Sequence, residues 1–100
     1  MKLATIGMGT MGEYTTKVLE DHVDKIIVYD PNITTNYNHA SSMQEAVANA
    51  DLVMYWVPTH EVYDVMKRSL GHCKPGALIS GQTSRKVPEA LAFDKYAKNL

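Results

Sequence analysis

Residues 2–12 read KLATIGMGTMG, and this stretch decides the fold. Lys2 to Ile6 is a short run rich in apolar and β-branched residues, which is typical of a strand. Glycines follow at once in the spacing G-x-G-x-x-G, from Gly7 to Gly12. Apolar residues then recur at helical spacing from Met11 to about His22. The stretch therefore predicts a strand, a tight glycine turn and a helix in direct succession.

The three glycines of this turn have distinct expected roles. Gly7 permits the tight turn, Gly9 lets the backbone approach a pyrophosphate, and Gly12 lets the helix pack closely on the strand. The helix amino terminus presents N–H groups and a partial positive charge to phosphates. In this strand–turn–helix context the motif predicts dinucleotide binding.

The rest of the chain alternates short apolar runs with amphipathic stretches, which is typical of a parallel α/β sheet. Further strands are expected at Lys25–Tyr29, Tyr37–Ala40, Leu52–Val57 and Ala77–Ser80. Helices are expected over Met43–Ala50, after Pro58 and from about Val87. With right-handed crossovers, these elements predict a Rossmann-type doubly wound parallel sheet. Its strand order is expected to be 3-2-1-4-5, truncated before a sixth strand.

Asp30 stands at the end of the second expected strand, 18 residues after Gly12. A carboxylate there can accept hydrogen bonds from the adenosine ribose hydroxyls, and it repels a 2′-phosphate unless a cation stands nearby. The adjoining residues 31–33 supply no cation. We therefore expect an NAD(P) cofactor, with NAD favoured over NADP.

Composition narrows the class of protein. The 100 residues correspond to one small domain, and the net charge of −1 offers no basic field for nucleic acid. No apolar run reaches the roughly 20 residues that span a bilayer. The single cysteine, Cys73, fits a reducing compartment, so cytoplasm is expected. His72 and Cys73 are adjacent and not at metal-ligand spacing, so no metal site is expected.

A polar segment, Gly81–Glu89, follows the fifth expected strand and reads GQTSRKVPE. Together with the Ala-Phe and Lys-Tyr pairs after it, this segment resembles the prephenate dehydrogenase family, especially its fungal-type members. The resemblance also includes the glycine turn, Asp30 and the stretch from Asp51 to Pro58. It implies oxidative decarboxylation of prephenate to 4-hydroxyphenylpyruvate with NAD(P)+, a step of tyrosine biosynthesis.

The resemblance assigns site residues by position. Ser84 matches the family serine that contacts substrate and hydrogen-bonds the catalytic histidine, and the neighbouring Gln82 and Thr83 are expected beside the substrate. The expected cofactor contacts are Gly7, Met8, Gly9, Thr10, Met11, Gly12, Asp30, Val57 and Pro58.

The resemblance further implies a longer parent enzyme. The catalytic histidine of the family follows the Ser84 region, beyond Leu100, as do the last strand and the helical catalytic and dimerisation domain. We therefore expect residues 1–100 to be an incomplete NAD(P)-binding domain of a homodimeric enzyme, inactive by itself.

Two alternatives stay open. The glycine turn also suits a 3-hydroxyacid or imine dehydrogenase or reductase of the 6-phosphogluconate-dehydrogenase-like group. The chain could also be a stand-alone NAD-binding module without catalytic activity.

Overall fold

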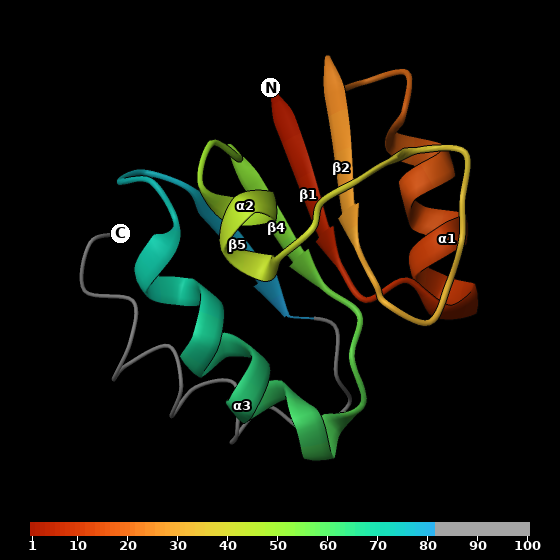
Figure 1. Ribbon diagram of the computed structural model, residues 1–100. Coiled ribbons are helices and arrows are strands. Elements are labelled where there is room, and N and C mark those ends of the chain that lie inside the picture. The colour runs from red at the N-terminus through yellow and green to blue at the C-terminus, as the bar shows by residue number, and fades with distance from the viewer. Residues whose placement is uncertain (82–100) are drawn as a thin grey trace.

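The computed structural model describes residues 1–81 (Figure 1). The predicted Gln82, Thr83, Ser84 and the helix near Val87 lie outside the described residues. In chain order the elements are β1 (Lys2–Ile6), α1 (Gly9–Leu19), β2 (Lys25–Tyr29), β3 (Asn38–His39), α2 (Met43–Val47), β4 (Leu52–Tyr55), α3 (Thr59–Ser69), a 3₁₀ turn η1 (Leu70–His72) and β5 (Leu78–Gly81).

The strands form one parallel sheet in the order β3-β2-β1-β4-β5, which confirms the predicted Rossmann-type topology. β1 is central: its Leu3 lies between Ile26 of β2 and Leu52 of β4. Because all the strands are parallel, their carboxyl ends lie at the same edge of the sheet. This carboxyl edge is where the glycine turn lies.

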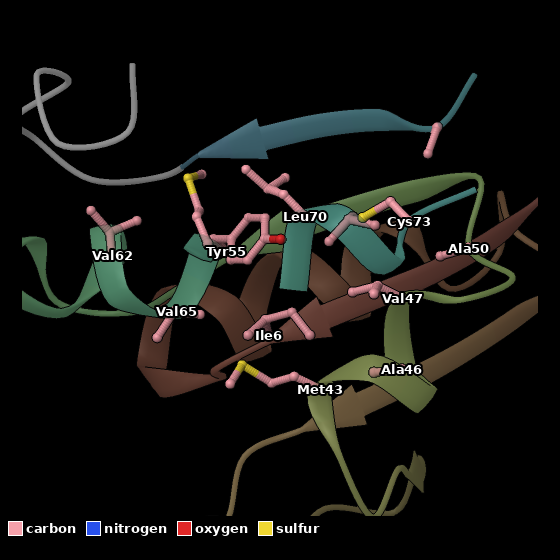
Figure 2. Packing of buried hydrophobic residues seen from close by; sticks show 14 residues of the cluster. Ile6, Met43, Ala46, Val47, Ala50, Tyr55, Val62, Val65, Leu70 and Cys73 are labelled. Atoms are coloured by element: carbon pink, nitrogen blue, oxygen red, sulfur yellow. The ribbon is translucent and has the colours of Figure 1, made fainter. Parts of the chain in front are cut away.

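One face of the sheet carries the main apolar core (Figure 2). Ile6 and Tyr55 point from the sheet into it, and both are at most 1% exposed. Val47 of α2, Val62 of α3 and Leu70 of η1 cover this face, and each is fully buried. β1 and β4 are buried on both faces, as expected for strands that lie between layers.

The opposite face is covered by α1, which stands apart from α2 and α3 in Figure 1. α1 buries only Gly12 and Thr16, and the Thr16 hydroxyl lies 3.4 Å from that of Thr5 on β1. The apolar residues at helical spacing do not face the sheet, since Met11, Tyr14 and Val18 are 63%, 67% and 53% exposed. Small residues line the contact because α1 lies close to the strands.

Boundaries differ slightly from those predicted. α1 begins at Gly9, within the glycine motif, and β4 ends at Tyr55 instead of Val57. α2 begins as expected, because Ser42 Oγ accepts a hydrogen bond from Glu45 N at 3.1 Å.

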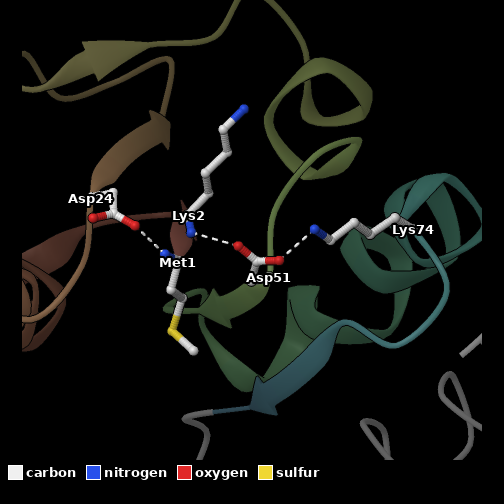
Figure 3. Close-up of polar contacts among 5 residues, drawn as sticks. All are labelled: Met1, Lys2, Asp24, Asp51 and Lys74. Atoms are coloured by element: carbon white, nitrogen blue, oxygen red, sulfur yellow. Dashed lines mark hydrogen bonds and ion pairs between the residues drawn. The ribbon is translucent and has the colours of Figure 1, made fainter.

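Polar groups connect the strands at the amino edge of the sheet (Figure 3). The amino group of Met1 pairs with Asp24, at the start of β2. Asp51, just before β4, accepts a hydrogen bond from the backbone of Lys2 at 2.7 Å and pairs with Lys74. This set of contacts, the amino-edge network, joins segments leading into β1, β2, β4 and β5.

Candidate functional site

The glycine turn carries two residues with left-handed backbone. Gly7 has φ +76° and Gly9 has φ +54°, values that favour glycine. A Cβ on Gly7 would lie 2.9 Å from Val57 Cγ1 and 3.0 Å from the Trp56 carbonyl oxygen. A Cβ on Gly9 would meet nothing within 4 Å. Gly7 is thus confined by the two residues that follow β4, whereas the backbone of Gly9 faces open space.

Gly12 is needed for another reason. A Cβ there would lie 2.9 Å from Cγ and 3.2 Å from Cβ of Trp56, which follows β4. These atoms are close to the tryptophan backbone and cannot swing away. The third glycine of the motif therefore lets α1 rest on the indole of Trp56.

Asp30 fastens the glycine turn to the end of β2. Its carboxylate accepts one hydrogen bond from Met8 N at 3.0 Å and another from Asn32 N at 2.9 Å. Gly7 N also donates to the carbonyl of Tyr29 at 2.8 Å. Since each carboxylate oxygen accepts more than one hydrogen bond, Asp30 retains acceptor capacity toward a ligand.

A cleft of about 450 Å³ opens at the carboxyl edge of the sheet. Six of the predicted cofactor residues line it: Gly7, Met8, Gly9, Asp30, Val57 and Pro58. The other three, Thr10, Met11 and Gly12, lie in the first turns of α1 and do not line the cleft. Asn32 and Trp56, which flank predicted residues, also line it.

The residues of the opposite wall of the cleft were not among the site residues predicted from the sequence. This wall comes from Ile33, Met43 and three residues of α3, namely Glu61, Val65 and Arg68. Glu61, Val65 and Arg68 are spaced i, i+4 and i+7, so they share one helix face. The helical periodicity was visible in the sequence, but the sequence did not show that this helix face lies across a cleft from the glycine turn.

The cleft suits a dinucleotide. No side chain caps the amino terminus of α1, so its first N–H groups can receive an anion. The space beside Gly9, which a Cβ would occupy, lets a phosphate come close to the backbone. Asp30 offers an acceptor for ribose hydroxyls, and Ile33, Met43 and Val65 offer an apolar wall for a base. The residues present therefore fit NAD(P).

Other chemistry finds no support among the described residues. Burial raises the pKa of Cys73 to about 11, which keeps the thiol protonated and a poor nucleophile. Within residues 1–81, no group of histidine, cysteine and carboxylate side chains is arranged to hold a metal ion. In the same part of the chain, every helix is too short or too polar to cross a membrane.

The parallel sheet and its glycine-lined cleft define a Rossmann-type α/β domain. Residues 2–100 match the family described as the NAD binding domain of 6-phosphogluconate dehydrogenase. The chain belongs to this family and is an NAD(P)-binding domain of oxidoreductase type.

Solved structures agree in fold. One solved structure is that of 3-hydroxyisobutyrate dehydrogenase of Mycobacterium tuberculosis with L-serine. It matches 95% of the chain with a TM-score of 0.79 and 25% identity. Pyrroline carboxylate reductase of Plasmodium falciparum, with NADP bound, matches 83% with a TM-score of 0.74 and 20% identity. D-lactate dehydrogenase of Escherichia coli matches 96% with a TM-score of 0.72 and 12% identity. Below 25% identity the likeness concerns the fold alone.

The chain spans 37%, 33% and 34% of these three proteins. Among curated proteins, none matches it.

Proposed function

We propose that the chain is the cofactor-binding part of an NAD(P)-dependent dehydrogenase that oxidises a small 3-hydroxy acid. The observation that carries the proposal is the likeness to the mycobacterial 3-hydroxyisobutyrate dehydrogenase, over 95% of the chain at 25% identity. The family match over residues 2–100 agrees with it. The hydroxyacid alternative of the sequence analysis thus becomes the main proposal.

The cleft residues divide the cofactor between them in this proposal. The pyrophosphate lies at the amino end of α1, beside the backbone of Gly9. Asp30 accepts from the adenosine ribose, and Val57 and Pro58 border the path toward the nicotinamide. When bound, NAD(P)+ supplies the acceptor for the hydride that leaves the substrate carbon. The chain itself orients the cofactor and shields one side of it from water.

Prephenate dehydrogenase stays a second candidate because of the segment Gly81–Glu89, which carries the sequence resemblance. In that case Ser84, with Gln82 and Thr83, contacts the substrate. The family and the relatives named above favour the hydroxyacid reading, so prephenate ranks second. The homodimer that the prephenate dehydrogenase resemblance implies stays a proposal for the parent enzyme, and the chain spans about a third of the length of its structural relatives.

Cofactor binding can be tested on the chain itself. The chain contains one tryptophan, Trp56, and this residue is among those that line the cleft. Titration with NADH or NADPH is expected to quench its fluorescence in a saturable manner, with energy transfer to the nicotinamide. Absence of saturable binding to a folded chain, checked by calorimetry, would remove the proposal.

The substrate class is tested with the complete natural polypeptide. We expect NAD(P)+ reduction with 3-hydroxyisobutyrate or L-serine, and none with prephenate. Turnover of prephenate together with release of carbon dioxide would instead select the second candidate.

A further inference from the structure

A cation lies in the cleft where the sequence offered none. Arg68 of α3 lines the same cavity as Asp30, although residues 31–33 beside Asp30 are uncharged. Its guanidinium pairs with Asp64 one turn earlier, with Nε 3.5 Å from Oδ2. Both side chains are exposed, at 55% and 71%, so solvent weakens this pair and the guanidinium can exchange partners.

The backbone of Arg68 is held against α2, whose first residue, Met43, also lines the cleft. Its carbonyl accepts a hydrogen bond from Gln44 Nε2 at 3.2 Å, which holds this turn of α3 against the first turn of α2. The adjacent Met43 and the loop residues Asn32 and Ile33 line the cleft there. Asp30, the expected ribose contact, belongs to the same loop.

We infer that Arg68 receives the 2′-phosphate of NADP, so that the cleft accepts NADP as well as NAD. The inference rests on the proposed cofactor site. Asp30 repels the 2′-phosphate, while Arg68 offers it a charge-assisted pair and gives up its exposed contact with Asp64. Cofactor preference is therefore set by two walls of the cleft and is modest in size.

The test isolates the phosphate by comparing two fragments of the cofactor. Adenosine 2′,5′-bisphosphate and adenosine 5′-monophosphate differ by the 2′-phosphate alone, and both bind without any nicotinamide or turnover. Calorimetric titration of the chain with each fragment gives the ratio of their affinities. Changes that affect the shared adenosine 5′-phosphate part alter both affinities and cancel in this ratio.

Arg68→Ala is expected to weaken the bisphosphate by roughly tenfold or more, the scale of one charge-assisted contact, and the monophosphate by less than about twofold. Arg68→Lys is expected to fall between, because an ammonium keeps the charge but loses the fork. Alanine suits a helix and leaves the Gln44 bond to the backbone carbonyl intact, so the fold is preserved.

Two further variants sharpen the result. Asp64→Asn releases the guanidinium and is expected to raise the bisphosphate-to-monophosphate affinity ratio by about two- to threefold, the scale of an exposed ion pair. Lys67→Ala removes a neighbouring exposed cation of α3 that does not line the cleft. It is the matched control and should leave the ratio unchanged.

The outcomes separate the two proposals. One outcome is that the native chain binds both fragments while Arg68→Ala lowers both affinities equally, or neither. In that case Arg68 does not bind the 2′-phosphate, and only the present inference is refuted. If the native chain binds neither fragment nor the intact cofactors, the proposed cofactor site falls and takes this inference with it.

Discussion

At the scale of single residues, two glycines share a backbone conformation in different surroundings. Gly9 has φ +54° and Gly76 has φ +86°, and a Cβ on either would meet no atom within 4 Å. Gly9 lines the cofactor cleft, whereas Gly76 lies in the turn before β5. Conformational cost and ligand approach can therefore be separated by one pair of substitutions.

Gly9→Ala and Gly76→Ala are each expected to destabilise the fold by about 1 kcal/mol, the cost of left-handed backbone for an L-residue. Only Gly9→Ala should also lose affinity for NADH, because its methyl group occupies the space that a phosphate needs. Urea unfolding and fluorescence titration measure the two effects. Equal loss of affinity in both variants would contradict this role of Gly9.

Gly12 gives a prediction whose sign depends on its neighbour. In the native chain, Gly12→Ala is expected to cost about 1–3 kcal/mol, because the new Cβ overlaps the indole of Trp56. In a Trp56→Ala background the overlap is gone, and the same change should be neutral or stabilising by up to about 1 kcal/mol through helix propensity. A double-mutant cycle of unfolding free energies measures this coupling. Additive effects would refute the contact.

At the scale of elements, a buried hydrogen-bond chain joins β4 to α3. The Tyr55 hydroxyl lies 2.7 Å from Ser69 Oγ, which donates its own proton to the carbonyl of Val65 at 2.8 Å. Since a serine hydroxyl has one proton, Tyr55 must be the donor to Ser69. Burial raises the pKa of the Tyr55 phenol, so this proton stays in place across the range of protein stability.

Because Tyr55 donates the hydrogen bond to Ser69, removal of either hydroxyl is expected to have a different cost in stability. Tyr55→Phe removes one hydrogen bond and is expected to cost about 1 kcal/mol. Ser69→Ala leaves a buried phenol without an acceptor and is expected to cost more, about 1–3 kcal/mol. Equilibrium unfolding in urea compares them. A larger cost for Tyr55→Phe than for Ser69→Ala would contradict the assignment of Tyr55 as the donor to Ser69.

The elements themselves were largely predictable from sequence. Leu52–Tyr55 is a continuous apolar run between polar turns, and the glycine spacing after Ile6 fixes where α1 begins to within two residues. The packing of α1 was not predictable, because apolar periodicity does not reveal that the buried residues of this helix are Gly12 and Thr16. Contact there depends on the distance between layers, which Trp56 helps to set.

The candidate site was predictable on one side. Motif spacing located Gly9 and Asp30, since the glycine turn and the second strand end are local features. Val65 and Arg68 lie on a helix far along the chain, and only the three-dimensional crossover brings that helix opposite Asp30. The expectation that no cation stands near the ribose followed from sequence neighbours alone.

At the scale of the whole molecule, the amino-edge network ties together the segments that lead into four strands (Figure 3). The hydrogen bond from Lys74 and that from the Lys2 backbone hold the pKa of Asp51 below its ordinary value. The hydrogen bond from the terminal amino group likewise lowers the pKa of Asp24. Both carboxylates thus favour the folded state in their charged form.

Stability should therefore fall in acid. A depressed pKa in the folded state contributes stability above the ordinary value of about 4, and this contribution is lost as pH falls through the folded value. Asp51→Asn is expected to lower stability at neutral pH and to flatten the decline below about pH 4. Thermal unfolding at descending pH checks this. Asp21→Asn, an exposed residue outside the network, should keep the native slope.

The central position of β1 has a consequence for synthesis on the ribosome. Residues 2–6 are made before the other strands of the sheet, and β2 can join them once Tyr29 has emerged. The other side of β1 pairs with β4, which is complete only at Tyr55. During translation β1 therefore waits with one hydrogen-bonding edge uncovered until β4 has been made, and an unpaired edge of this kind is prone to association with other chains.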